Sequence, residues 1–144
     1  GFINGAFFIG LLVGSIICMK YSTVTATYKQ YFIGYGAFIS GILTILFGSI
    51  SFPLLAIILS VAIGLTSQLK NIPQQTIIQR SVPKEKLLTV YTSLGTVGTG
   101  LFGISSLAIG IAVDLVGVRI VFILSGVLLL LVSLVVLKNR RLFN

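Results

Sequence analysis

The chain has 144 residues, of which 56% are hydrophobic and only 8% charged, with ten Lys or Arg residues against two Asp or Glu residues. Soluble domains carry about 25% charged residues because their surfaces face water, so this composition excludes an ordinary soluble domain and indicates a protein that lies in a bilayer. The sequence has no His, one Cys and one Met. These are too few ligands for a haem, iron–sulfur or zinc site, so we expect no cofactor and no bound metal.

Five apolar segments are long enough to cross a bilayer, which takes about 17–25 residues. They cover residues 2–19, 32–50, 53–79, 87–113 and 120–137. The sequence therefore predicts an all-α membrane domain of about five transmembrane helices. The first segment begins at Gly1 without an initiating Met, a basic region or a cleavage site, which does not fit a signal peptide. We expect the chain to be a piece of a longer protein.

The first two predicted helices carry small residues at four-residue spacing. Small residues let membrane helices approach closely, since the bilayer gives apolar side chains no drive to associate. We predict that these faces pack tightly against neighbouring helices, or slide against them during transport. The sets are Ala6, Gly10 and Gly14 on the first helix and Gly36, Ser40, Thr44 and Gly48 on the second.

The third helix, residues 53–79, carries the most informative polar residues. At 100° per residue most of them fall within an arc of about 120°. Polar groups that face lipid would lack partners, so the arc must face a substrate path or another helix. Alternatively, because the helix is about 40 Å long, its polar end extends beyond the membrane surface. We predict that the arc lines a path. The candidate residues are Ser60, Gly64, Ser67, Gln68, Lys70, Asn71 and Gln74.

Two residues of this helix have alternative interpretations. Lys70 lies at the edge of the polar arc, where it either extends to the membrane surface or binds an anion. Pro73 has no N–H to donate, which loosens the helix at Leu69 and suits a gate, although such prolines are common in membrane helices.

The fourth and fifth helices differ in character. The fourth carries Gly95, Thr99 and Gly103 on one line, which again predicts close packing. Its glycine-rich run is not followed by the Gly-Lys-Ser/Thr of a phosphate loop, so no enzyme is predicted. The fifth is rich in Leu from Leu128 onward and is expected to face lipid.

The loop between these two helices holds Asp114, Gly117 and Arg119, and we expect Asp114 and Arg119 to pair across the turn. The other acidic residue is Glu85, between two lysines in the preceding connection. Neither carboxylate lies mid-membrane, so a proton carrier would belong to another part of the protein.

Basic residues indicate the orientation. Nine of the ten Lys and Arg residues lie in the connections after the first and third helices, at the end of the third helix or in the C-terminal tail, and only Arg119 lies elsewhere. Positive residues stay cytoplasmic, which predicts a multi-pass protein of the cell membrane with a cytoplasmic C-terminus. Their distribution between apolar segments does not favour a nucleic-acid partner.

Two stretches carry a family resemblance. One is Pro73-Gln-Gln-Thr-Ile-Ile-Gln-Arg-Ser-Val-Pro83, and the other is Gly110-Ile-Ala-Val-Asp-Leu-Val-Gly-Val-Arg119. With the helix order and loop charges, they resemble the C-terminal half of major facilitator superfamily transporters, closest to the macrolide-efflux type of drug exporter. The sequence departs from the family where Leu88-Thr89 replace a Gly-Arg pair.

The resemblance covers nearly the whole chain and implies that the five helices are the eighth to twelfth of twelve. It implies a substrate cavity between two six-helix halves, lined by the eighth, tenth and eleventh helices among others, with the ninth and twelfth outside. The expected partners are then the bilayer, a small-molecule substrate and a missing N-terminal half. The expected function is secondary active export of a drug-like, amphipathic molecule, as in multidrug efflux. The alternatives are a metabolite or siderophore transporter, or a transport-inactive sensor, assembly protein or truncated remnant.

Overall fold

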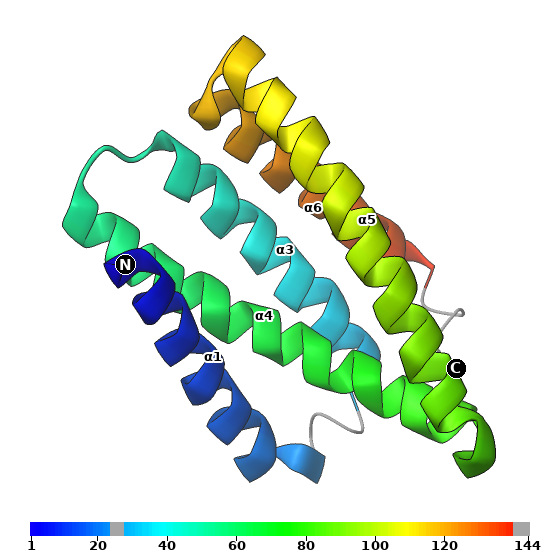
Figure 1. Ribbon diagram of the computed structural model, residues 1–144. Helices are drawn as coiled ribbons and strands as arrows, with labels where there is room; N and C mark the ends of the chain where they lie inside the picture. The colour runs from blue at the N-terminus through cyan, green and yellow to red at the C-terminus, as the bar shows by residue number, and fades with distance from the viewer. Residues whose placement is uncertain (24–27, 140–144) are drawn as a thin grey trace.

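The computed structural model describes residues 1–23 and 28–139 of the chain. These residues form five long α-helices and one short 3-10 helix, shown in Figure 1. Each long helix is apolar and long enough to cross a membrane, which confirms the predicted all-α class with five membrane-length helices. The elements are α1 (Phe2–Lys20), α3 (Lys29–Ser49), α4 (Pro53–Ser81), η1 (Lys84–Lys86), α5 (Leu87–Val116) and α6 (Val118–Lys138).

Proline and glycine set two of the helix ends. Pro53 is the first residue of α4, where its fixed φ suits the helix and its missing N–H would have had no partner. Gly117 separates α5 from α6 with a φ of 87°, a conformation that residues with a Cβ rarely adopt. The chain therefore turns back between two membrane-length helices at a single residue.

The helices lie in an order that differs from the sequence. In Figure 1, α4 lies between α1 and α3, while α6 packs on α3 and α5 lies along α6. We call the two ends of this bundle the Pro53 end and the Ser81 end. The Pro53 end also holds Gly1 and Gly117, and the Ser81 end also holds η1.

Small residues make the closest helix contact, between α1 and α4. The buried residues of α1 are Ala6, Gly10, Gly14 and Cys18, at four-residue spacing. A Cβ placed on Gly14 would lie 2.9 Å from the Leu65 carbonyl oxygen, and one on Gly10 would collide with the Val61 carbonyl group. The two backbones thus touch directly, the kind of packing that small residues permit in a bilayer.

A second close contact joins α3 to α6. A Cβ on Gly126 would lie 2.8 Å from the Gly41 carbonyl oxygen, and one on Gly41 would lie 3.0 Å from the Gly126 carbonyl oxygen. The rings of Phe47 and Phe122 pack nearby with centroids 5.2 Å apart. Leu128, Leu131 and Leu134 of α6 are exposed. The helix therefore packs through Gly126 and turns these leucines outward, to where lipid would lie.

Candidate transport path

The polar arc of α4 is divided between its two neighbours, and α1 takes one flank. Gly64 is buried against the α1 backbone, where a Cβ would lie 3.0 Å from the Leu11 nitrogen. One turn further on, the Gln68 side-chain amide donates a hydrogen bond of 2.9 Å to the Ser15 hydroxyl. Two of the seven candidate path residues thus take part in helix–helix contacts.

The other flank of α4 meets α3. The Ser40 hydroxyl donates to the Thr66 hydroxyl at 3.0 Å, and both residues are buried. Lys70 lies one turn along, with its Cβ 3.3 Å from where a Gly36 Cβ would be, and makes no hydrogen bond or ion pair with other described residues. Thr66 was not among the sequence candidates, because it lies outside the polar arc. Its hydrogen-bond partner Ser40 belongs to the small residues of α3 that were predicted to pack against another helix, and that prediction was a usable signal for this contact.

Four candidate residues remain on the face of α4 between these two flanks. Ser60, Ser67, Asn71 and Gln74 fall within an arc of about 60° at 100° per residue. Ser60 is buried and donates its hydroxyl to the Ala56 carbonyl oxygen at 2.8 Å, as hydroxyls in membrane helices commonly do. Ser67 and Asn71 are half-buried and Gln74 is exposed, so this line becomes more open toward the Ser81 end.

A hollow of about 260 Å³ lies at the Pro53 end of this face. Helices α1, α3, α4 and α6 line it, although the resemblance implied that α3 and α6, as the ninth and twelfth helices, lie outside the path. Its polar groups come from Asn4, Thr44 and Ser60 in a mainly apolar wall. Such a wall with a few placed polar groups is typical of small-molecule sites. Asn4 was not among the sequence candidates, although a lone amide in an apolar segment was a usable signal. The lining residues are Ile3, Asn4, Phe7, Thr44, Phe47, Ser60, Ile63 and Phe122.

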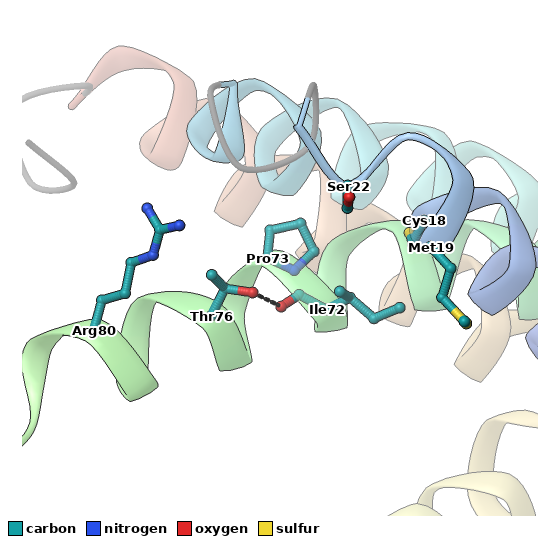
Figure 2. Close-up of a pocket in the computed structure, with 7 residues that line it drawn as sticks. All are labelled: Cys18, Met19, Ser22, Ile72, Pro73, Thr76 and Arg80. Atoms are coloured by element: carbon teal, nitrogen blue, oxygen red, sulfur yellow. Dashed lines mark hydrogen bonds between the residues drawn. The ribbon is translucent and has the colours of Figure 1, made fainter. Parts of the chain in front are cut away.

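A second hollow, of about 310 Å³, lies between α1 and α4 at the Ser81 end (Figure 2). Its α4 residues lie on the side of that helix opposite the line from Ser60 to Gln74, so the two hollows open to different faces. It is lined by Cys18, Met19, Ser22, Ile72, Pro73, Thr76 and Arg80.

The predicted packing face of α5 is open among the described residues. A Cβ on Gly95 or Gly103 would meet no atom within 4 Å, and the Thr99 hydroxyl donates back to the Gly95 carbonyl oxygen at 2.8 Å. None of the described residues of α5 is buried. Close packing of this face therefore stays a prediction, and its partner would lie outside the described residues.

The loop residues are arranged differently from the expectation. Arg119 donates a hydrogen bond of 2.6 Å to the Ser51 hydroxyl, which joins the start of α6 to the α3–α4 connection. Asp114 makes no ion pair with Arg119 among the described residues, so the expected pair is wrong. The reason is that Asp114 lies in α5, whereas Arg119 lies in α6 on the side that packs against Gly48 of α3. The basic tail residues Arg140 and Arg141 lie outside the described residues.

Comparison with known proteins agrees with these observations. The chain is similar to two proteins of Bacillus subtilis (strain 168): the uncharacterized MFS-type transporter YfmI, at 35% identity over 130 residues, and the uncharacterized MFS-type transporter YjbB, at 28% identity over 144 residues. The matches cover 90% and 100% of this chain but only 32% and 36% of those proteins. No solved structure matches the chain significantly. The model of the Major Facilitator Superfamily matches residues 1–142, so this chain of five membrane-length helices belongs to that superfamily of membrane transporters.

Proposed function

We propose that the chain is the eighth to twelfth helices of a twelve-helix secondary transporter that exports a drug-like or amphipathic small molecule. The observation that carries this proposal is the hollow on the polar side of α4, with Asn4, Thr44 and Ser60 in an otherwise apolar wall. Family membership supports transport, and the resemblance of the Pro73–Pro83 stretch to macrolide-efflux-type exporters supports a drug-like substrate.

The substrate path follows the face of α4 that neither neighbour covers. It begins at the hollow beside Ser60 and continues along Ser67, Asn71 and Gln74. Gly64 and Gln68 hold α1 in place beside this path, while Lys70 stands on its α3 flank. Among the described residues, those that line the hollow are all uncharged. This favours a neutral or amphipathic ligand held by apolar contact and a few neutral hydrogen bonds.

The open face of α5 supports a larger assembly. Thr92, Gly95, Thr96, Thr99 and Gly100 line a shallow depression on it. In a membrane protein such small, weakly polar surfaces suit contact with another helix. We infer that the N-terminal half of the protein, or the substrate path between the halves, covers this face.

The proposed location is the cell membrane, with the Ser81 end and the C-terminus on the cytoplasmic side. Lys20, Arg80, Lys84 and Lys86 all lie at or near the Ser81 end. Among the Lys and Arg residues that the structure describes, Arg119 alone lies at the Pro53 end. This asymmetry is the usual sign of a cytoplasmic face.

The experiment combines efflux with cysteine protection in the complete natural protein. Cells that express it should accumulate less of at least one fluorescent amphipathic dye than cells with an empty vector, and Asn71→Leu should reduce this difference. In a variant without native cysteines, Asn71→Cys should react with a water-soluble thiol reagent and be protected by that dye. Gln68→Cys is the matched control on the same helix, and it should react less because position 68 lies on the flank that contacts α1 at Ser15.

Three results would count against the proposal. Unchanged accumulation of every dye by a correctly inserted protein would contradict drug export. Uptake of a metabolite or an iron chelate in the same cells would favour the metabolite or siderophore alternative. Equal reactivity at positions 68 and 71 would mean that the polar face of α4 is not a defined path.

A further inference from the structure

The hollow between α1 and α4 at the Ser81 end has two kinds of wall. Cys18 and Pro73 are buried at its inner side, with Ile72 and Met19 beside them. Arg80 is exposed at the other end (Figure 2). Figure 2 shows its guanidinium on the same side of α4 as the Pro73 ring, with the Thr76 hydroxyl between them. The hollow thus leads from an apolar floor to a cation.

Its position separates it from the proposed transport path. The α4 residues that line this hollow and those of the line from Ser60 to Gln74 lie on nearly opposite sides of the helix. At 100° per residue, the mean directions of the two groups differ by about 170°. A substrate on the path would contact one side of the layer formed by α1, α4 and α3. The occupant of this hollow would approach from the other side.

The hollow is long enough to reach from the acyl-chain region of a bilayer to the headgroups. Ile72 and Arg80 lie eight residues apart, which is about 12 Å along a helix. The two polar zones of a bilayer add about 10–15 Å in total to a hydrocarbon core of about 30 Å. Each polar zone is thus about 5–8 Å deep, so Ile72 lies a few ångströms inside the hydrocarbon core when Arg80 lies at headgroup depth.

The charges favour an anionic headgroup. None of the described residues that line the hollow is acidic, and Arg80 makes no hydrogen bond or ion pair with other described residues. A guanidinium presents paired N–H donors that match two phosphate oxygens. Lys84 and Lys86 follow in η1 and add positive potential at the same end of the bundle.

We propose that this hollow binds one anionic phospholipid, with its phosphate on Arg80 and the upper part of an acyl chain against Met19 and Ile72. Membrane proteins commonly hold anionic lipids in basic pockets between helices at the cytoplasmic face. The bound lipid bridges α1 to the last two turns of α4, beyond the contact at Gln68. The choice of the cytoplasmic leaflet rests on the proposed orientation, whereas the binding itself does not.

The test measures lipid retention by the complete natural protein. Protein purified in a mild detergent is mixed with phosphatidylglycerol or phosphatidylcholine, and the bound lipid is counted by native mass spectrometry. We expect one tightly held phosphatidylglycerol and about tenfold weaker binding of phosphatidylcholine. Arg80→Gln should weaken phosphatidylglycerol binding about tenfold, whereas Arg80→Lys should retain much of it, because a charged hydrogen bond contributes enough for such a factor.

The matched control is Lys84→Gln, which removes one positive charge four residues away and outside the hollow. An equal loss in this variant would mean diffuse surface attraction and overturn the proposal, as would equal binding of the two lipids. A photoreactive phosphatidylglycerol should label residues 18–22 and 72–80, and labelling confined to other helices would also overturn it. Displacement by glycerol phosphate at the same concentration would show a site for small anions and not for lipid. These measurements do not depend on transport, so their failure leaves the proposed function standing.

Discussion

Gly64→Ala adds one methyl group where α1 and α4 touch. The new Cβ would lie 3.0 Å from the Leu11 nitrogen and 3.2 Å from the Gly10 carbonyl carbon, and closer still to the Phe7 carbonyl oxygen. All three are backbone atoms that cannot rotate away, so α1 must withdraw by about 1 Å. Such a gap forfeits a quarter to a half of the dispersion energy of each contact across it.

The net effect of Gly64→Ala on the stability of the protein is the sum of two opposing contributions. Overpacking of a close contact costs about 1–3 kcal/mol, and the higher helix propensity of Ala returns up to about 1 kcal/mol. Gly5→Ala is the matched control on α1, because its Cβ would meet nothing within 4 Å and only the favourable term applies. In the complete natural protein we expect Gly64→Ala to melt about 2–6 °C below Gly5→Ala.

The assay is thermal unfolding in detergent, followed by the loss of the monodisperse peak in size-exclusion chromatography. Equal melting temperatures for the two variants would refute the direct backbone contact between α1 and α4. A lower melting temperature for Gly5→Ala would refute it as well, since that position would then be the crowded one.

Two further predictions concern orientation and the open face of α5. A single cysteine at Ser81 should resist an impermeant thiol reagent in intact cells and react after permeabilisation, because basic residues keep that end cytoplasmic; labelling from outside would invert the proposed topology. Gly103→Leu should lower the folded yield and the transport of the complete protein by filling a face that another helix covers, while Leu128→Ala on exposed α6 should leave both nearly unchanged. Similar effects of these two changes would remove the basis for packing through α5.

The number and approximate limits of the helices could be predicted from sequence because long apolar segments leave few alternatives in a bilayer. Pro53 begins α4, as expected for a residue whose missing N–H needs no partner in the first turn of a helix. The ends of the described helices lie within three residues of the predicted ranges. α5 extends to Val116 because Gly117, and not the polar Asp114, ends it. A charged residue close to the membrane surface is a poor marker of a helix end.

The division of the polar arc could not be predicted, because it depends on which helix lies on each flank of α4. Gln68 and Asn71 are only about 60° apart on the helix, yet Gln68 bonds to Ser15 while Asn71 lies beyond that contact. The pair of Gly41 and Gly126 was missed for the same reason. A small residue shows that a helix can approach there, but the partner comes from the arrangement in space.

The position of α4 between α1 and α3 has a consequence for synthesis of the protein. Helices α1 and α3 leave the ribosome before α4 and α6, but in the finished bundle they pack mainly on these later helices, α1 on α4 and α3 on α4 and α6. Their glycine-lined faces therefore remain in lipid until α4 has been inserted between them. In a nascent chain that stops before Pro53, α1 and α3 would lack the helices on which they mainly pack, and such a chain would be open to capture by membrane quality control.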